Sequence, residues 1–310
     1  MSVRMALQHY LSLEDMSAAD TWELLRLAQE LKRDREEGRT HPRLAGKTLA
    51  MIFQKPSLRT RVSFEAGMTQ LGGHAIYLGP SDIRLGERET VEDVASTLAR
   101  MADLIMARVF GHEIVVELAK HSASPVINGL SDREHPCQVL ADLMTIYERR
   151  RRLEGVRAVF VGDGNNVAHS FMLGAALMGM HCTVIGPAGF EPDTEVLERA
   201  REIGRTTGAA IRASRDPMDV KGADVVYTDV WASMGQEAEA AERRSIFQPY
   251  QVNDSLMALA EPDATLLHCL PAHYGEEIDY ATSRRPGSAI FDQAENRLHA
   301  QKALMVRLAG

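Results

Sequence analysis

Cysteine and long apolar runs are both scarce in this chain of 310 residues. Three cysteines, Cys137, Cys182 and Cys269, cannot pair into an even disulfide framework. No segment reads as a signal peptide or as an apolar span long enough for a membrane helix. The sequence therefore predicts a protein of the reducing cytoplasm.

Positive charge is not in excess either. The formal net charge is -8, from 35 Lys and Arg residues against 43 Asp and Glu residues, which argues against a nucleic-acid surface. The one basic run, Arg149 to Arg152, closes a predicted helix just before Gly155, where cations complement the helix dipole. A composition that is 45% hydrophobic and 25% charged indicates a globular protein with room for two cores.

Short apolar runs alternate with amphipathic stretches along the whole chain. A helix is expected from Ala18 to Glu37, closed by Gly38. Strands are expected at 48–54, 74–78, 104–109, 125–130, 157–162, 182–186, 209–213, 224–229 and 265–269, with helices near 59–71, 90–101 and 111–121 and between the later strands. A last strand near Ala289 to Phe291 should lead into a helix from Asn296 to Leu308. Repeated strand and helix alternation predicts an α/β protein with two doubly wound domains and parallel sheets.

The expected domain boundaries follow from this alternation. Residues 1–135 should form the first domain, 136–152 a connecting helix and 153–288 the second domain, followed by a C-terminal segment, 289–310. Ligands bind beyond the carboxyl ends of strands in open parallel sheets. An active site is therefore expected in a cleft where the strand ends of the two domains face each other.

The segment from Phe53 to Glu65 predicts a binding site for a compact dianion. An apolar strand runs directly into a helix start, whose unpaired N–H groups carry partial positive charge. Ser57, Arg59, Thr60 and Arg61 add hydroxyl and guanidinium donors. The glycines and the Gly-Lys-Ser/Thr ending of a nucleotide-binding loop are absent. Taken alone, the segment could equally be a helix start with two surface arginines.

Polar residues follow several other expected strands. Arg108 ends the third strand, His135 follows the fourth, and Asp229 and Cys269 end strands of the second series. Each has a structural alternative, since His135 or Asp229 could simply cap a helix. The shared position at strand ends favours ligand sites.

Three other chemistries are disfavoured. Zinc binding by His268 and Cys269 is disfavoured because neighbouring residues of a strand point to opposite faces, and no Cys-x-x-Cys pair supports it. Cys269 also lacks the helix N-terminal position that most readily forms a nucleophilic thiolate. The turn at 162–166 lacks the third glycine of a dinucleotide site.

Four segments together resemble the aspartate and ornithine carbamoyltransferases. They are Ser57-Leu58-Arg59-Thr60-Arg61, His135-Pro136-Cys137-Gln138, Asp229 to Gly235 and His268-Cys269-Leu270-Pro271. The Asp229 to Gly235 segment, which contains Ser233 and Met234, resembles the ornithine-binding signature in particular. The stretch from Phe291 to Arg297 resembles the family's closing motif.

The resemblance implies transfer of a carbamoyl group from carbamoyl phosphate to the δ-amine of L-ornithine, giving L-citrulline and phosphate, with no metal or organic cofactor. It implies carbamoyl-phosphate binding by the first domain and ornithine binding by the second. The implied carbamoyl-phosphate ligands are Ser57, Leu58, Arg59, Thr60, Arg84, Arg108, His135, Gln138, Cys269, Leu270 and Arg297. The implied ornithine ligands are Asn166, Asp229, Ser233 and Met234. The implied catalytic residues are Arg108, His135, Asp229 and Cys269.

Three positions depart from the family pattern. Gln54 stands where an acidic residue is usual, Tyr274 where arginine is frequent, and Arg84 where glutamine is usual. The resemblance implies that the loop carrying Arg84 reaches a neighbouring subunit's site in a homotrimer or a multiple of trimers. Alternatives that stay open are a carbamoyltransferase for putrescine or for acetylated or succinylated ornithine, and a catalytically silent homologue that binds carbamoyl phosphate.

Overall fold

The computed structural model describes residues 7–232 and 239–310. The chain divides into two compact units. Unit 1 comprises the residues up to Leu140 together with Arg297–Gly310, and unit 2 comprises Ala141–Asn296. Each contains one parallel sheet, so the predicted α/β class with two parallel-sheet domains is confirmed.

The sheet of unit 1 has four parallel strands in the order β2-β1-β3-β4. They are β1 (Thr48–Phe53), β2 (His74–Leu78), β3 (Leu104–Arg108) and β4 (Val126–Leu130). Every residue of β3, and all of β1 except Thr48, is buried. This burial explains why these strands read as continuous apolar runs in the sequence.

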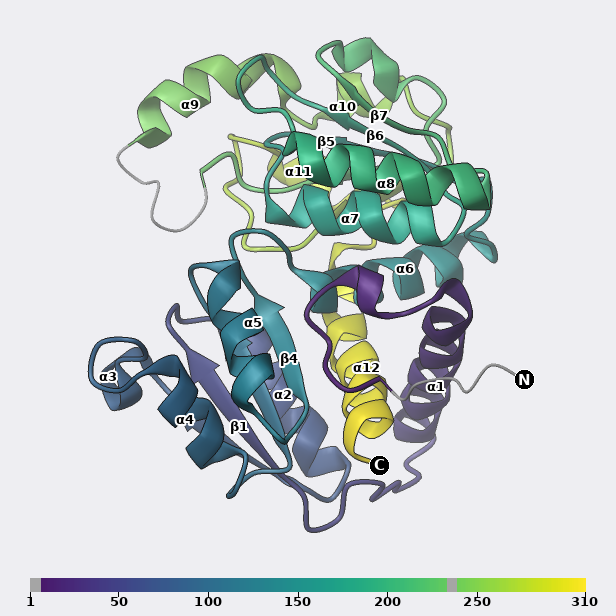
Figure 1. Cartoon of the computed structure of the whole chain (residues 1–310). Helices are drawn as coiled ribbons and strands as arrows, with labels where there is room; N and C mark the ends of the chain where they lie inside the picture. The colour runs from purple at the N-terminus through teal and green to yellow at the C-terminus, as the bar shows by residue number, and fades with distance from the viewer. Residues whose placement is uncertain (1–6, 233–238) are drawn as a thin grey trace. The chain divides into compact units, whose positions relative to one another are not determined.

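Helices cover both faces of this sheet (Figure 1). The chain crosses from β1 to β2 in one direction and from β2 through β3 to β4 in the other, and such crossovers are right-handed. Consequently α2 (Leu58–Gln70) lies on one face, and α4 (Val91–Leu98) and α5 (His112–His121) lie on the other. Val94, Val115 and Leu118 of the latter pair pack on Ile52 and Ile105 of the sheet.

The sheet of unit 2 has five parallel strands in the order β7-β6-β5-β8-β9. They are β5 (Arg157–Val161), β6 (His181–Ile185), β7 (Ile211–Ser214), β8 (Val225–Thr228) and β9 (Thr265–His268). The helices α7 (Asn166–Leu177) and α8 (Thr194–Thr207) lie side by side over it (Figure 1). Beneath α7, the Tyr227 ring packs 5.1 Å from the rings of both Phe160 and Phe171.

Three long helices and several short elements complete the described part of the chain. The long helices beside the sheets are α1 (Ala18–Glu36), α6 (Pro136–Arg150) and α12 (Ile290–Ala309). The short elements are η1 (Leu13–Asp15), α3 (Pro80–Ile83), η2 (Pro217–Val220), α9 (Ala240–Phe247), η4 (Gln248–Tyr250), α10 (Asp254–Met257) and α11 (Tyr280–Ser283). The predicted helix from Ala18 to Glu37 is confirmed, with Gly38 at φ 69° just beyond it. In unit 1, α1 and α12 run next to each other (Figure 1), and Arg307 pairs with Asp20 across them.

The strand predicted near Ala289 to Phe291 is wrong, because α12 already begins at Ile290. Only an isolated bridge between Ser288 and Leu266 extends the sheet here. The helical start places Gln293 in the interior, where it accepts a hydrogen bond from His268 N (2.8 Å) and donates one to Asp142 Oδ1 (2.7 Å). The need to satisfy these buried polar groups favours a helix at this position over the predicted strand.

The amino-terminal segment covers one edge of the unit 1 sheet. Tyr10 N donates to Val126 O, and Asn128 N donates to Tyr10 O, both at 2.8 Å. The Tyr10 side chain is fully buried. The segment therefore occupies backbone groups of β4 that an edge strand would otherwise leave open.

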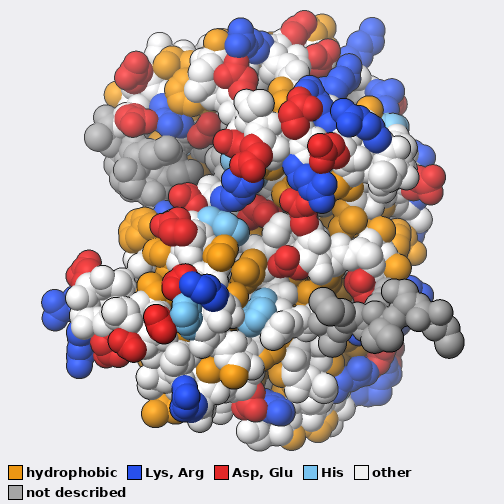
Figure 2. Space-filling model, viewed as in Figure 1, with side chains coloured by type: hydrophobic (Ala, Val, Ile, Leu, Met, Phe, Trp, Pro, Cys, Tyr) orange, Lys and Arg blue, Asp and Glu red, His pale blue; other side chains and the backbone are white. Residues whose placement is uncertain are grey.

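Charges on the surface are mixed in sign. Figure 2 shows acidic and basic side chains interspersed over the face in view. Two arginines of the basic run are used inside unit 2, where Arg149 pairs with Asp292 and Arg150 pairs with Asp263. Among residues 7–232 and 239–310, no helix combines the length and the apolar character of a membrane span.

Candidate active site

The predicted residues gather where each sheet reverses its strand order. In unit 1 this switch point lies between β1 and β3, and in unit 2 between β5 and β8. The carboxyl ends of such neighbouring strands form the crevice in which α/β proteins bind ligands. Ser57 and Arg108 follow or end β1 and β3, while the turn at 162–165 and Asp229 follow β5 and β8.

The helix start after β1 is built as an anion site. Ser57 is the N-cap of α2, and its hydroxyl accepts a hydrogen bond from Thr60 N at 3.3 Å. The first turn contains no acidic residue, so nothing in it neutralises the positive end of the helix dipole. Arg59 is half-buried. The Leu58 side chain is 72% exposed, so a role of Leu58 in binding the anion would fall to its backbone.

Arg61 does not join this anion site. Its Nε donates to Glu65 Oε1 at 2.9 Å, and its guanidinium lies 4.0 Å from the centre of the Tyr77 ring. The sequence suggested Arg61 as a further donor because it follows Arg59 and Thr60. Each residue of a helix adds a rotation of about 100°, so Arg61 lies about 200° around the helix from Arg59 and points away from it.

Arg297 reaches the anion site from α12. Its guanidinium donates to Thr60 Oγ1 at 2.7 Å and to Gln138 Oε1 at 3.3 Å, and it is 3% exposed. Arg297 is therefore a buried residue and not a surface arginine of α12. These contacts bring together residues from α2, α6 and α12.

His135 and Arg108 lie close to Arg297 and Arg59 of the anion site. His135 precedes α6, and its carbonyl accepts from Gln138 N at 3.0 Å. Burial lowers the pKa of His135 well below its usual 6.5, and the charges of three arginines lower it further. They are Arg297, Arg108 and Arg59. A neutral imidazole among guanidiniums can donate one hydrogen bond without adding charge.

In unit 2, Asp229 is the centre of a buried hydrogen-bond group. Its Oδ1 accepts from Cys269 Sγ and its Oδ2 from Asn165 Nδ2, both at 2.9 Å. Asn165 is also the N-cap of α7, with Oδ1 accepting from Val167 N and Ala168 N. The carboxylate is thus held by a thiol and an amide, with lone pairs left for an ammonium group.

Sequence reasoning was wrong about the geometry of His268 and Cys269. Strand β9 ends at His268, so the alternation of faces stops there. Ligand atoms of His268, Cys269 and Asp229 lie within 4.8 Å of one another, a spacing that a metal ion could use. Both nitrogens of His268 have protein partners, however, since Nδ1 accepts from Leu270 N at 2.9 Å and Nε2 lies 3.1 Å from Glu277 Oε1. The hydrogen bonds account for this cluster as it stands.

Other predicted residues lie on loops and at the ends of elements. Arg84 lies on an exposed loop at φ 45°, and its described hydrogen bonds are backbone bonds within that loop. Asn166 is half-buried at the start of α7, and Leu270 adopts φ 59° just after Cys269. Ser233 and Met234 lie outside the described residues.

Two residues of the site were missed by sequence reasoning. Asn165 was passed over for Asn166, although the N-cap preference of asparagine before an apolar helix could have indicated it. Lys55 lies near Arg108, and its pKa is lowered by burial first and by that guanidinium second. Its ammonium also sits 4.4 Å from the centre of the Phe110 ring.

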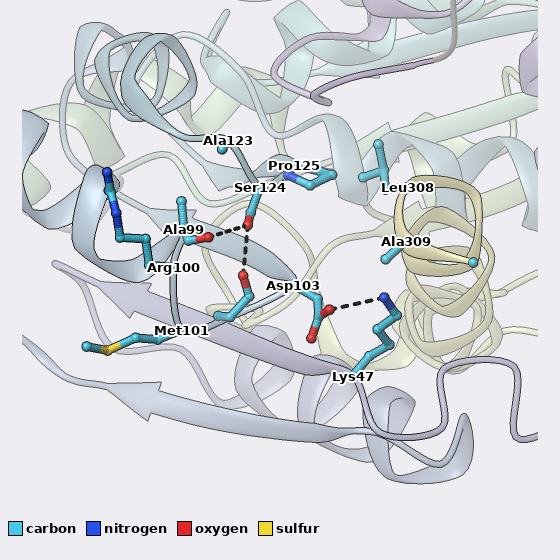
Figure 3. Close-up of a pocket in the computed structure, with 12 residues that line it drawn as sticks. Lys47, Ala99, Arg100, Met101, Asp103, Ala123, Ser124, Pro125, Leu308 and Ala309 are labelled. Atoms are coloured by element: carbon cyan, nitrogen blue, oxygen red, sulfur yellow. Dashed lines mark hydrogen bonds and ion pairs between the residues drawn. The ribbon is translucent and has the colours of Figure 1, made fainter.

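A pocket of about 540 Å³ in unit 1 lies away from these residues. It is bordered by residues before β1, β3 and β4 and by the end of α12 (Figure 3). Polar groups that line it are hydrogen-bonded to one another: Lys47 Nζ donates to Asp103 Oδ1 at 3.1 Å, and Ser124 Oγ donates to Ala102 O at 2.8 Å. It therefore sits at the amino ends of the strands, opposite the carboxyl ends that carry the candidate site.

The electrostatics of His135 lead to a pH prediction. We expect its imidazole to be neutral at pH 6.5, because burial and three guanidiniums disfavour the cation. The unfolded chain takes up this proton more readily than the folded one, so His135 makes the fold less stable as pH falls below 6.5. Nitrogen-15 NMR of histidine-labelled protein, assigned with a His135→Gln variant, measures the titration. A midpoint at or above 6.5 would contradict the arrangement.

Comparisons with known proteins agree with the site. The family model described as the carbamoyl-P binding domain of aspartate/ornithine carbamoyltransferase matches residues 8–148, and that of the Asp/Orn binding domain matches residues 154–308. The ornithine carbamoyltransferase of Anoxybacillus flavithermus is 54% identical over 96% of both chains. The structure of the ornithine carbamoyltransferase from Pyrococcus furiosus has a TM-score of 0.96 at 52% identity, covering 98% of both chains.

A structure of an acetylornithine transcarbamylase complexed with acetylcitrulline has a TM-score of 0.88 at 31% identity, covering 98% of this chain and 100% of that one. The matching models span both units, and the resemblance of the four segments is confirmed. On this evidence the chain belongs to the aspartate/ornithine carbamoyltransferase family.

Proposed function

We propose that this protein is an enzyme that transfers the carbamoyl group of carbamoyl phosphate to the δ-amine of L-ornithine, giving L-citrulline and phosphate. One observation carries the proposal. Unit 1 carries the arginine-rich anion site at its switch point and matches the carbamoyl-P binding domain of the family. Unit 2 carries the carboxylate of Asp229 at its switch point and matches the Asp/Orn binding domain. The relatives at 50% identity or more bear the name ornithine carbamoyltransferase.

The anion site suits the phosphate of carbamoyl phosphate. Ser57, Arg59, Thr60 and Arg297 supply donors to a dianion at the positive end of α2. Arg108 and neutral His135 are suited to the carbonyl oxygen, which becomes an oxyanion when the amine attacks the carbon. A donor aimed at a developing oxyanion is worth about 2.7–4 kcal/mol. Gln138 and the Leu270 carbonyl are suited to the carbamoyl NH₂, because an amide can both donate and accept.

The carboxylate site suits the amine. An alkyl ammonium titrates near pH ~10.4, so only roughly one ornithine molecule in a thousand has a neutral δ-amine near neutrality. Asp229 and the Cys269 thiol orient that amine, and Asn166 is suited to the amino-acid head, with Ser233 and Met234 completing the selection. The N–C bond forms as the C–O bond to phosphate breaks. The amine proton passes to the departing phosphate or to solvent. All atoms and charges of the transfer are then accounted for without a metal or an organic cofactor.

The fold does not decide between ornithine and acetylated ornithine, because the acetylornithine transcarbamylase shares it. Sequence similarity favours ornithine, at 54% and 52% identity against 31%. The Asp229 to Gly235 segment adds to this, since it carries the ornithine-type Ser233-Met234-Gly235.

The same reasoning extends to assembly and compartment. We propose a homotrimer, or a multiple of trimers, in which Arg84 acts on the carbamoyl phosphate of a neighbouring subunit. The exposed position of Arg84 supports that role, although its neighbours Ile83 and Leu85 pack against the core of unit 1. A cytoplasmic location is supported by the free thiols of Cys137, Cys182 and Cys269.

A substrate panel tests the proposed function. We expect kcat/KM for L-ornithine to exceed that for putrescine, L-aspartate and N-acetylornithine by roughly 100-fold or more, because a site built for a charged head rejects analogues that leave its polar groups unpaired. A colorimetric ureido assay measures all four amines. Enzyme dialysed against a chelator should keep its rate. Preference for N-acetylornithine, or no ureido product at all, would overturn the proposal.

Paired substitutions test the two binding sites. Arg59→Ala should weaken the binding of carbamoyl phosphate by roughly 10- to 150-fold, because a charge-assisted contact is lost. Asp229→Asn should leave that affinity intact and sharply lower turnover of ornithine. Isothermal titration and steady-state kinetics separate the two effects. Arg61→Ala is the matched control, because Arg61 engages Glu65 and Tyr77 instead. Equal effects of Arg59→Ala and Arg61→Ala would contradict the anion-site assignment.

Mixed oligomers test the role of Arg84. Subunits with Arg84→Ala and subunits with His135→Ala should each be poor enzymes alone. After subunit exchange, some sites would combine an intact Arg84 from one chain with an intact His135 from another, so activity should exceed the sum of the parents. If confirmed mixed oligomers show no gain, Arg84 does not act across subunits.

A further inference from the structure

The helix α12 holds both ends of α2. At the amino end, Arg297 donates to Thr60 Oγ1 at 2.7 Å. At the carboxyl end, Lys302 Nζ donates to Gln70 Oε1 at 3.0 Å. These contacts lie five residues apart on α12, about 7.5 Å along its axis. The anion site at the start of α2 is therefore part of a two-point attachment.

The seam between the two helices is tightly packed. Gly67 of α2 is buried, and a Cβ added to it would lie 3.0 Å from Met305 Cε and 3.3 Å from Lys302 Cγ. Close packing of this kind transmits displacement instead of absorbing it. A shift at the Gln70 end would consequently move Thr60 relative to Arg297.

Lys302 has an unusual environment for an ammonium group. Its side chain is fully buried, and its direct partners are neutral, with His41 Nε2 at 2.7 Å besides Gln70. A carboxylate stands one step further away, because His41 Nδ1 lies 3.6 Å from Asp34 Oδ2. A buried lysine is rarely retained without such partners.

We propose that Lys302 is a positioning residue for the anion site: it fixes α2 against α12 so that Thr60 and Arg297 keep the geometry that binds the phosphate of carbamoyl phosphate. The inference rests on the proposed function. Catalytic geometry is sensitive to such supports, since displacements near 1 Å can change rates by about 100-fold.

The charge on Lys302 adds a pH dependence. Burial, and to a smaller extent the nearby Arg35, lower its pKa from 10.5 to about 8, while Asp34 acts in the opposite direction. The other charged or titratable groups facing this cluster are Lys32, His41, Arg43 and His299. Above pH 8 the neutral amine holds Gln70 less firmly, so affinity for carbamoyl phosphate should fall. Stability moves the other way: the unfolded chain binds this proton up to pH 10.5, so the fold gains stability between pH 8 and 10.5.

The test compares Lys302→Met, Gln70→Met, the double variant and Lys47→Met with the wild type. Methionine is an unbranched, uncharged replacement of similar size, and Lys47 is a control lysine of unit 1 whose ammonium pairs with Asp103. Titration calorimetry with carbamoyl phosphate is done on both sides of pH 8. The ratio of variant to wild-type Kd cancels the titration of the ligand itself.

Both single variants should bind carbamoyl phosphate about 3- to 10-fold more weakly below pH 8, and the double variant no more weakly than either, because the two act through one contact. The KM for ornithine should stay unchanged, and Lys302→Met should lose the fall in affinity above pH 8. Lys47→Met should behave as the wild type. Arg59→Ala serves as the reference for the anion site.

Two outcomes would overturn the inference. Unchanged affinity in Lys302→Met, or a lowered unfolding temperature with unchanged affinity, would make Lys302 structural only. If Arg59→Ala also leaves affinity unchanged, the anion-site assignment itself fails. If Arg59→Ala weakens binding and Lys302→Met does not, only the positioning role is lost.

Discussion

Concentrated positive charge at the start of α2 is the constraint around which unit 1 is arranged. Arg108 and Arg297 are 6% and 3% exposed, and mutual repulsion between buried guanidiniums opposes their assembly. Thr60 and Gln138 meet this constraint as neutral acceptors for Arg297, and the same charges hold down the pKa of His135. The proposed dianionic ligand would add negative charge at this place. The first turn of α2 contains no acidic residue, so its positive end is not neutralised from within the turn.

The two units divide the chemistry by charge. Unit 1 offers cations and hydroxyl groups to a leaving group, and unit 2 offers a carboxylate held by Asn165 and Cys269 to an amine. Both use the carboxyl ends of strands at a switch point, where helix N-termini and turns converge without interrupting the sheet. An acetylornithine transcarbamylase shares this scaffold, so the choice of amine depends on local side chains and not on the fold.

Much of this arrangement could be predicted from the sequence, because buried parallel strands read as apolar runs and anion-binding helix starts carry a local pattern of hydroxyl and guanidinium groups. What failed depended on tertiary context. The helical start at Ile290 follows from the partners of Gln293, and the approach of His268 to Cys269 follows from the point at which β9 stops. The N-cap preference could indicate Asn165, but its contact with Asp229 and the contact of Lys302 with His41 join residues 64 and 261 positions apart along the chain, which the sequence does not reveal.

The bridge made by Tyr10 also bears on how this protein avoids self-association through its sheets. A parallel strand at an open edge is a template for another chain. Tyr10 occupies the backbone groups of Val126 and Asn128, and so closes the β4 edge. The opposite edge, β2, alternates exposed and half-buried residues and displays Ile76 at 43% exposure. A truncation past Tyr10 would leave the sheet with two open edges, which turns a folded domain into a candidate for edge-to-edge polymerisation during expression, whatever its effect on the chemistry.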